Sequence, residues 1–156
     1  MSDLGNARGY FGVALDNPKT AHNVGGVLRA AQVYGASFVS ISGARNKCVK
    51  HPTNTMAAHR HMPVHIVEDP LAVRPYDCQV VAVDLVPGAV SLIDFKHPER
   101  AIYVFGAEDQ TLGRRILERS QHAVMVPTRH CMNLSAAVNV ILYDRLAKSA
   151  AQEGRG

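Results

Sequence analysis

Residues 124–146, VMVPTRHCMNLSAAVNVILYDRL, join a short apolar run to a long amphipathic segment through a polar loop. The apolar run is typical of a buried strand, and the apolar residues after the loop recur at helical spacing. These residues are Leu134, Ala137, Val138, Ile141 and Leu142. Two buried elements therefore flank a loop of polar and reactive side chains. In an α/β protein, ligands bind at such a place, at the carboxyl end of a strand.

Similar apolar runs occur along the whole chain and alternate with helical patterns. The predicted strands are Tyr10–Leu15, Phe38–Ser42, Val64–Val67, Gln79–Val86, Ala101–Gly106 and His122–Val126. The predicted helices are Thr20–Tyr34, Thr53–Arg60, Thr111–Arg119 and Asn133–Ala150. This alternation indicates a mostly parallel, six-stranded α/β sheet with helices on both faces.

Length and composition favour one globular domain over residues 1–156, with loose tails at 1–9 and 151–156. The chain has 156 residues, of which 47% are apolar and 19% are charged, enough to build a core. It contains no membrane-spanning apolar run and no apolar segment typical of a signal peptide. We therefore expect a cytoplasmic protein without membrane association. Three cysteines without a CxxC pair are expected to be free thiols.

Positive charge is concentrated in the first half of the chain. The net charge is +4, and no Asp or Glu occurs between Asn17 and Val67. Six cations and five histidines lie in that stretch, with Arg45–Arg60 as its densest part. Such a surface suits a polyanion such as RNA. A solvated basic face without a partner is an equally good interpretation of the composition alone.

The start of the first predicted helix is a candidate site. Asn23 is expected to cap this helix, and Arg29 follows it by less than two turns. Gly25 and Gly26 cost a helix roughly 1 kcal/mol each relative to alanine. They indicate either that a ligand approaches the backbone there or that the helix packs tightly on the sheet.

Two further candidates follow predicted strands. Gly106 and Glu108 come after Ala101–Gly106, and Glu108 can orient a substrate group or cap the next helix. Asn133 can cap the last helix or contact a ligand, whereas Cys131 can be catalytic or inert. Asn139 interrupts the apolar face of that helix, so it needs a polar partner, for example across a subunit interface.

Other site types fit the sequence poorly. Cys48, His51, His59 and His61 do not have the spacing of a standard zinc site, and we expect no metal. Cys131 and His130 lack an orienting third group for a nucleophilic pair. The first strand is not followed by a GxGxxG loop, which argues against an ordinary dinucleotide site.

The three candidate segments, in their order along the chain, resemble the SpoU (TrmH-like) branch of the SPOUT superfamily of RNA ribose 2′-O-methyltransferases. The resemblance spans residues 10–148. Asn23, Gly25 and Arg29 match the family motif Asn-x-Gly-x-x-x-Arg, and Phe105, Gly106 and Glu108 match Phe-Gly-x-Glu. The third family motif consists of Ile-Pro, Ser-Leu-Asn and Leu-Tyr-Glu. It corresponds here to Val126-Pro127, Cys131-Met132-Asn133 and Leu142-Tyr143-Asp144. Cys131 replaces the usual serine of the family, and a thiol donates hydrogen bonds poorly.

This resemblance implies a C-terminal deep trefoil knot that binds S-adenosylmethionine, and a homodimer whose interface contains the last helix. It implies that the cofactor contacts three loops through Asp84, Leu85, Gly106, Val126, Cys131, Met132 and Leu134. It further implies methyl transfer to RNA, with tRNA favoured over rRNA because small family members often act on tRNA.

The catalytic residues implied by the resemblance are Asn23, Arg29, Glu108 and Asn133. The family proposal makes Arg29 the base, but a guanidinium hardly ever loses its proton. Arg29 can instead hold a phosphate, with Glu108 orienting Arg29 or Asn23. Two alternatives remain: methylation of a ring nitrogen, disfavoured by the few aromatic residues, and RNA binding without efficient chemistry.

Overall fold

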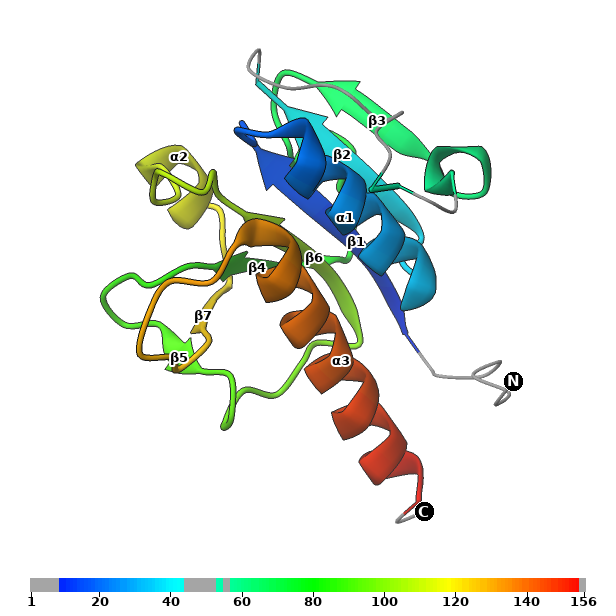
Figure 1. The fold of residues 1–156 in the computed structure, drawn as a ribbon. Helices are drawn as coiled ribbons and strands as arrows, with labels where there is room; N and C mark the ends of the chain where they lie inside the picture. The colour runs from blue at the N-terminus through cyan, green and yellow to red at the C-terminus, as the bar shows by residue number, and fades with distance from the viewer. Residues whose placement is uncertain (1–8, 44–52, 55–56, 155–156) are drawn as a thin grey trace.

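The computed structural model describes residues 9–43, 53–54 and 57–154. In this part of the chain, seven parallel strands form one sheet in the order β3-β2-β1-β6-β4-β7-β5 (Figure 1). The strands are β1 Tyr10–Asp16, β2 Phe38–Ser42, β3 Val64–Val67, β4 Gln79–Val83, β5 Val90–Ser91, β6 Arg100–Phe105 and β7 His122–Met125. The helices are α1 Ala21–Val33, α2 Arg114–Leu117 and α3 Leu134–Glu153, with a 3-10 turn at Ala58–Arg60 (η1).

The predicted parallel α/β sheet is confirmed, but the number of strands was wrong. The additional strand, β5, has only two residues and pairs with the edge of β7 through Val90 and Ser91. A two-residue strand is too short to produce a detectable alternation of apolar and polar residues. The structure therefore has seven strands where the sequence pattern indicates six.

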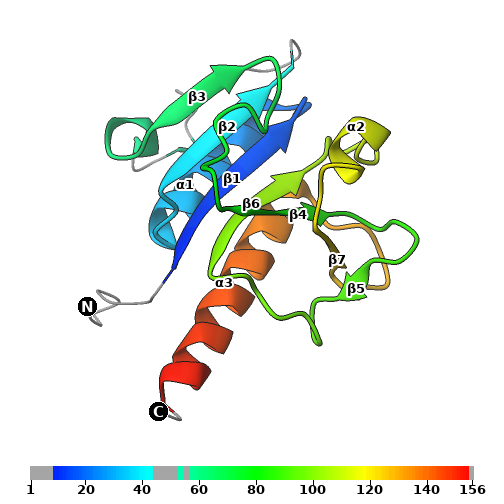
Figure 2. The same ribbon diagram turned by 180° about the vertical axis from the view of Figure 1, so that it is seen from behind.

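Helices lie on both faces of the sheet, but unequally (Figures 1 and 2). The two long helices, α1 and α3, pack side by side on one face, where they cover Val13 and Leu15 of β1. The opposite face carries Ala14 of β1 and is covered by Ile116 of the short α2 and by Leu71. Both faces of the central strands are thus buried, as a parallel sheet requires.

Several predicted elements end at other residues. The predicted helix over 53–60 is only the turn η1 in its described part, where Ala57 has a φ of 47°. The strand β4 ends three residues early because the Asp84 carboxylate accepts the Leu85 N–H at 2.7 Å and turns the chain. The helix α3 continues to Glu153, so residues 151–153 are helical and not a loose tail.

At one end of the sheet, the carboxyl ends of four strands lie next to one another, in the order β1, β6, β4 and β7. The helix α1 follows β1, and three loops follow the other strands at residues 84–89, 106–113 and 126–133. Parallel strands place these four segments next to one another, although they are far apart in the sequence. This edge is where a doubly wound sheet binds its ligand.

A buried polar cluster at the other end of the sheet joins α3 to β6. The His97 ring, whose side chain is only 4% exposed, contacts Asp144 at 2.8 Å and the Tyr103 hydroxyl at 2.7 Å. Arg145 donates to the same hydroxyl at 3.0 Å, and Lys148 pairs with Asp144 at 2.8 Å. Burial raises the pKa of Tyr103 to about 12, so its hydroxyl stays protonated.

The same two cations hold the segment that precedes β6. Arg145 donates to the carbonyls of Pro98 and Glu99, and Lys148 donates to those of Leu92 and Phe95. These bonds satisfy the carbonyls of Pro98 and Phe95 and give a second donor to those of Glu99 and Leu92, which also accept backbone N–H groups. The carboxyl-terminal half of α3 consequently fixes the path of residues 92–99.

No helix in the described part of the chain has both the length and the apolar character needed to cross a membrane.

His97 should make the stability of the protein depend on pH. Burial, which outweighs the opposing effect of Asp144, lowers the pKa of His97 below its ordinary value of 6.5. The unfolded chain therefore binds a proton more readily, so the stabilisation is present above about pH 6.5 and is lost as the pH falls toward the lowered value. The free energy of unfolding, measured with urea between pH 7.5 and 5.5, should fall less steeply in His97→Gln than in wild type.

The exposed histidine of the turn after η1 provides a control, since His61→Gln should retain the wild-type slope. Parallel pH curves for wild type and His97→Gln would contradict the expectation.

Candidate functional site

The first turn of α1 is capped one turn earlier than the sequence predicts. Thr20, in extended conformation, is the N-cap, and its hydroxyl accepts the Asn23 N–H at 3.3 Å. Asn23 is therefore not the cap, and its side-chain amide is available for a distant contact. It donates to Oε1 of Glu108 at 2.6 Å.

Glu108 binds the start of α1 with both carboxylate oxygens. Oε2 accepts the Lys19 N–H at 2.8 Å, whereas Oε1 accepts the Asn23 amide and, at 3.5 Å, the Thr20 hydroxyl. Burial alone would raise the pKa of Glu108, but hydrogen bonds from Asn23 and the backbone lower it overall. The result is an ionised carboxylate at the positive end of α1, a favourable position for an anion.

Glu108 thus binds the residues at the start of α1, whose N-cap is Thr20, and does not cap the helix that follows it. The N-cap of α2 is Gly113, which has no side chain to accept a hydrogen bond. Asp109 reinforces the contact with α1, since it lies 3.7 Å from the Lys19 ammonium. The loop after β6 is consequently fastened to the segment after β1.

Close packing accounts for the two glycines of α1. A Cβ on Gly25 would collide with the side chain of Thr53, and one on Gly26 would lie 2.9 Å from the Cβ of Ser135 on α3. The neighbouring elements approach α1 too closely for any side chain at these positions. The close approach to the backbone is confirmed, but the neighbours are Thr53 and the helix α3 and not the sheet.

Arg29 lies in an open groove between α1 and α3. The groove has a volume of about 650 Å³ and is lined by Gly26, Arg29, Ala30, Val33, Thr53, Ser135 and Asn139. Arg29 is exposed, and in the described residues its guanidinium makes neither a hydrogen bond nor an ion pair. It is a free cation in a concave surface, which suits an anionic ligand.

Asn139 does not interrupt the core as the sequence suggested. It is exposed in the groove, and its side chain donates to the Ser135 carbonyl one turn earlier in α3, at 2.8 Å. The side-chain amide is exposed and has a partner within its own helix, so it does not require one from another subunit.

Asn133 is the N-cap of α3. Its Oδ1 accepts the Ala136 N–H at 2.7 Å and the Ser135 hydroxyl at 3.2 Å. Ser135 also lines the groove that contains Arg29. Ser135 therefore connects the segment after β7, through Asn133, with the groove that contains Arg29.

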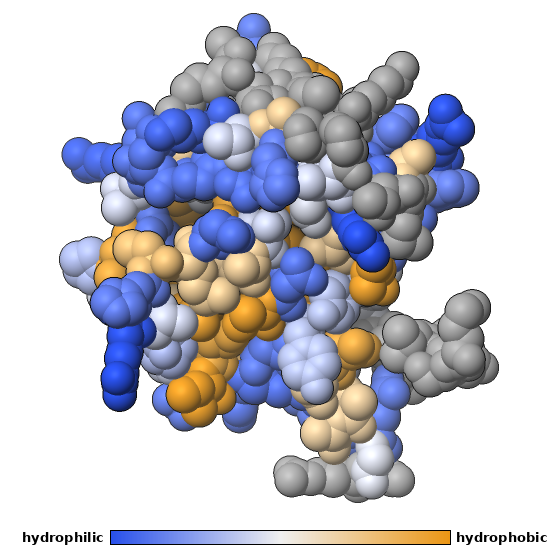
Figure 3. All heavy atoms as spheres, viewed as in Figure 1, coloured by the Kyte–Doolittle hydropathy of each residue, from blue (hydrophilic) through white to orange (hydrophobic). Residues whose placement is uncertain are grey.

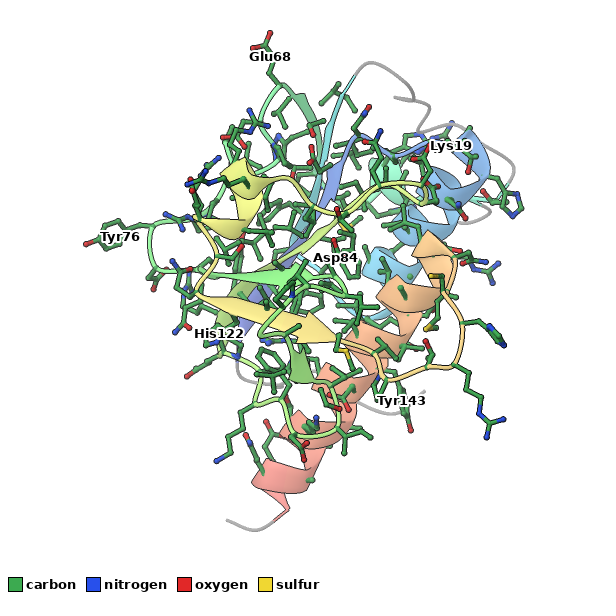
Figure 4. All side chains as sticks on the ribbon, turned by 90° about the vertical axis from the view of Figure 1, so that its left-hand side faces the viewer. Lys19, Glu68, Tyr76, Asp84, His122 and Tyr143 are labelled. Carbon is green, nitrogen blue, oxygen red and sulfur yellow. The ribbon has the colours of Figure 1, made fainter. Side chains whose placement is uncertain are left out.

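Asp84 fastens two of the three loops to each other. Its Oδ1 accepts the Leu85 N–H at 2.7 Å, and its Oδ2 accepts the N–H of Leu112 at 2.6 Å. Figure 4 shows Asp84 near the centre of the face formed by β4 and β7, with Lys19 above it at the start of α1. The bond from the Leu112 N–H to Asp84 thus holds the loop after β6 against the loop after β4.

The remaining predicted cofactor residues lie in or beside these three loops. Leu85 is 73% exposed, although it is apolar. Gly106 faces the loop after β6, where a Cβ would lie 3.2 Å from the Gln110 carbonyl. Val126 and Met132 are half-buried, Cys131 is an exposed free thiol, and Leu134 is buried at the start of α3.

Of the two partners that the sequence hypothesis allows for Glu108, Arg29 and Asn23, the structure has Asn23. The roles of Lys19 and Thr20 were missed, although Thr20 carries the usual signal of an N-cap. Most of the basic stretch, with Arg45, Lys47 and Lys50, lies outside the described residues, as do Cys48 and His51 of the zinc alternative. Among described residues, no group of three His, Cys, Asp or Glu side chains is placed to hold a metal.

A comparison with protein families identifies this arrangement. The model of the SpoU rRNA methylase family matches residues 10–143, from the first residue of β1 into α3. The chain belongs to the SpoU rRNA methylase family. The Asn23–Glu108 contact joins the first two segments that carry the resemblance, and Gly26 of the first segment packs against Ser135 of the third.

Similar proteins include members of the SpoU family that modify RNA. A tRNA (guanosine(18)-2′-O)-methyltransferase from Aquifex aeolicus (strain VF5) is 24% identical over 140 residues, covering 85% of this chain and 66% of the relative. The AdoMet-bound rRNA methyltransferase from Sinorhizobium meliloti superposes with a TM-score of 0.79 at 23% identity, covering 90% of this chain and 57% of that one. The present chain thus spans just under two thirds of the first relative and less of the second.

A third similar structure comes from work on 2-OH methylation of C/U34 on tRNA. It superposes with a TM-score of 0.77 at 21% identity and covers 92% of this chain and 99% of that one. These similarities show that the SpoU fold is shared.

Loss of the Glu108 carboxylate should loosen the start of α1. In Glu108→Ala, the N–H of Lys19 and the Asn23 amide lose their acceptor, so the amides of the first turn should exchange hydrogen faster. We expect a loss of stability of about 1 kcal/mol, as for removal of a helix cap. Glu118→Ala, next to α2, is the matched control. Unchanged hydrogen exchange around Lys19 in Glu108→Ala would contradict a stabilising contact between Glu108 and the start of α1.

Proposed function

We propose that this protein transfers a methyl group from S-adenosylmethionine to a ribose 2′-hydroxyl of RNA, with tRNA as the substrate. The convergence of three sequence motifs at one edge of the sheet carries the proposal. Asn23 contacts Glu108, and Arg29 shares a groove with Ser135, which contacts Asn133. Membership of the SpoU family and the tRNA-modifying relative support the same activity.

The three loops fit S-adenosylmethionine by their chemistry. Leu85, Val126 and Met132 leave apolar surface accessible at the ends of neighbouring strands. Gly106 leaves the backbone after β6 without a side chain of its own. We assign the cofactor to these residues with Asp84, Cys131 and Leu134, and the AdoMet-bound structure of similar fold supports this assignment.

The proposal includes the deep trefoil knot expected from the resemblance. β7 lies between β4 and β5, which precede it in the chain and are joined by residues 84–89. The Asp84 N–H and the Leu92 N–H bond to consecutive carbonyls of β7, those of Val124 and Met125. These bonds hold both ends of the connection against β7, and they support the proposed threading of the chain after β7 before α3.

Arg29 acts in this scheme as a cation and not as a base. The cofactor supplies an activated methyl group, so the main task of the protein is alignment of the ribose oxygen. Arg29 has no anionic partner in the described part of the chain and is free to bind a phosphate beside the ribose. Glu108 keeps Asn23 in place, and Asn133 fixes the start of α3 next to the groove.

The proposal also includes a homodimer formed through α3 and α1. The outward side chains of α3 at Asn139, Tyr143, Ala147 and Ala150 are exposed and uncharged. Tyr143 is 61% exposed, and Val33 of α1 is 51% exposed beside the groove. Figure 3 shows mostly pale and orange residues along α3, in contrast to the strongly hydrophilic region at the top of the view. A long uncharged helix face of this kind is typical of a subunit interface.

The cytoplasmic location and the single domain expected from the sequence belong to the same proposal.

The activity is tested with purified protein, S-adenosylmethionine labelled in its methyl group, and total tRNA from cells lacking the protein. Methylation of a ribose 2′-oxygen blocks alkaline cleavage at that nucleotide. The label should therefore appear in an alkali-resistant dinucleotide. Label in an alkali-released mononucleotide would indicate ring-nitrogen methylation, whereas cofactor and RNA binding without transfer would indicate an inactive RNA-binding protein.

Arg29→Ala should abolish this methyl transfer and leave S-adenosylmethionine binding nearly intact, because Arg29 lines the groove and not the three cofactor loops. Transfer is followed by the label and cofactor binding by calorimetry. Arg74→Ala, which removes an exposed arginine from the segment before β4, is the control. Turnover at the wild-type rate in Arg29→Ala would remove Arg29 from the mechanism.

Tyr143→Glu should shift the protein toward the monomer, because the substitution places a charge in the uncharged face of α3. Light scattering after gel filtration gives the mass of each form. Glu153→Lys, near the end of α3, should leave the mass unchanged. A wild-type protein that is already monomeric at micromolar concentration would exclude the dimer.

A further inference from the structure

Ser135 lies where α3 meets α1, on the wall of the groove that contains Arg29. A Cβ on Gly26 of α1 would lie only 2.9 Å from the Cβ of Ser135, so the two helices are in contact at this point. The preceding residue, Leu134, belongs to the proposed cofactor site. Ser135 therefore lies between the residues assigned to the cofactor and the arginine assigned to a phosphate, which is where the proposed reaction requires the target ribose.

The hydroxyl proton of Ser135 is engaged by Asn133. The Ala136 N–H donates to Oδ1 of Asn133 at 2.7 Å. Because a backbone N–H can only donate, the atom that faces it is the oxygen of the Asn133 amide and not its nitrogen. The Ser135 hydroxyl lies 3.2 Å from the same oxygen, so it must be the donor of that hydrogen bond. The backbone of α3 thus determines the orientation of both side chains.

The Ser135 oxygen is left as a hydrogen-bond acceptor. A serine hydroxyl has one proton to donate and two lone pairs that can accept. Within the described part of the chain, no group donates to this oxygen. The neighbouring Asn139 amide donates instead to the backbone carbonyl of Ser135, at 2.8 Å. The half-buried Ser135 side chain therefore has lone pairs available for a donor that enters the groove.

Other acceptors near the site are less suited to a ribose hydroxyl. Glu108 accepts the Lys19 N–H with one carboxylate oxygen and the Asn23 amide with the other. The two oxygens of Asp84 each accept a backbone N–H. A substrate hydroxyl would compete with these donors, which hold the loops together. Asn139 also lines the groove, but it lies one turn of α3 further from the proposed cofactor residues.

We propose that the Ser135 oxygen accepts a hydrogen bond from the target 2′-hydroxyl and thereby turns a lone pair of that hydroxyl toward the methyl group. The 2′-oxygen forms a bond to the methyl carbon while the carbon–sulfur bond breaks and leaves its electrons on sulfur. The methylated oxygen is then a strong acid, and its proton passes to water in the open groove. Ser135 keeps its own proton, so its contribution is alignment and not proton abstraction. This inference rests on the proposed function and adds a substrate-contacting residue to it.

The test removes the two partners of the proposed hydrogen bond separately and together. Ser135→Ala removes the hydroxyl and keeps the Cβ that packs against Gly26. A synthetic tRNA with 2′-deoxyribose at the nucleotide that the activity assay identifies removes the 2′-hydroxyl. The affinity of each protein for the ribose and deoxyribose forms is measured by filter binding with saturating S-adenosylhomocysteine, which cannot donate a methyl group.

Wild-type protein should bind the ribose form about fivefold more tightly than the deoxyribose form, as expected for one hydrogen bond between neutral groups. In Ser135→Ala this ratio should fall to about one, because the acceptor of the hydroxyl is gone. The cycle cancels the effect of the deoxyribose on sugar conformation, which both proteins experience alike. The kcat of Ser135→Ala should be lower by about tenfold or more, whereas its S-adenosylmethionine affinity should stay at the wild-type value.

Two further variants separate the lone pairs of Ser135 from its place in the helix. Ser135→Cys keeps a side chain beyond the Cβ, but sulfur is a weak acceptor, so its ratio should also be close to one. Ser149→Ala removes a half-buried serine near the other end of α3 and should keep the wild-type ratio and kcat. Hydrogen exchange of the Ala136 amide reports separately on the Asn133 cap, and Ser135→Ala should leave it nearly unchanged.

The outcomes distinguish this inference from the proposed function. If wild-type protein methylates tRNA while Ser135→Ala retains the wild-type ratio, Ser135 does not contact the 2′-hydroxyl and only the inference fails, even when kcat has fallen. Faster exchange of the Ala136 amide with an unchanged ratio would show that the hydroxyl serves only the cap of α3, which also overturns it. If wild-type protein neither binds S-adenosylmethionine nor transfers methyl groups, the proposed function fails and this inference fails with it.

Discussion

The contact between Glu108 and the start of α1 is the interaction on which the arrangement of the site depends. A carboxylate after β6 accepts hydrogen bonds from Asn23 and from the Lys19 backbone after β1. Since β1 and β6 are neighbouring strands, both segments leave the sheet at the same edge. The contact sets the position of α1, and α1 in turn supplies Arg29 and the two glycines that admit Thr53 and Ser135.

Much of this fold could be predicted from the sequence, because strands buried on both faces produce short apolar runs between helical patterns. The bounds of Phe38–Ser42 and Val64–Val67 agree with the structure. The two-residue β5 could not be found, since its pairing depends on β7 and not on its own residues. The bounds of β4 depend likewise on hydrogen bonds of Asp84 with a loop 28 residues away.

The candidate residues were found more readily than their partners. Asn23, Glu108 and Asn133 stand in recognisable motifs, but the sequence left open whether Glu108 orients Arg29 or Asn23. Such contacts join residues that are 85 positions apart and follow from the order of the strands. The cluster of His97, Asp144 and Arg145 was missed because its members are also far apart in the sequence. In addition, a charged residue in a helix normally indicates a solvated face.

The two sheet edges bear on how copies of the chain can meet. A free edge strand exposes backbone groups that can pair with another chain and lead to aggregation. At the β5 edge that template is only two residues long, and at the β3 edge it is four. Edge strands this short provide few unpaired backbone groups for hydrogen bonds with a strand of another chain. Ordered self-association is thereby directed away from continuous intermolecular sheets and toward side-chain contacts between helices, which leave the backbone pairing of each copy intact.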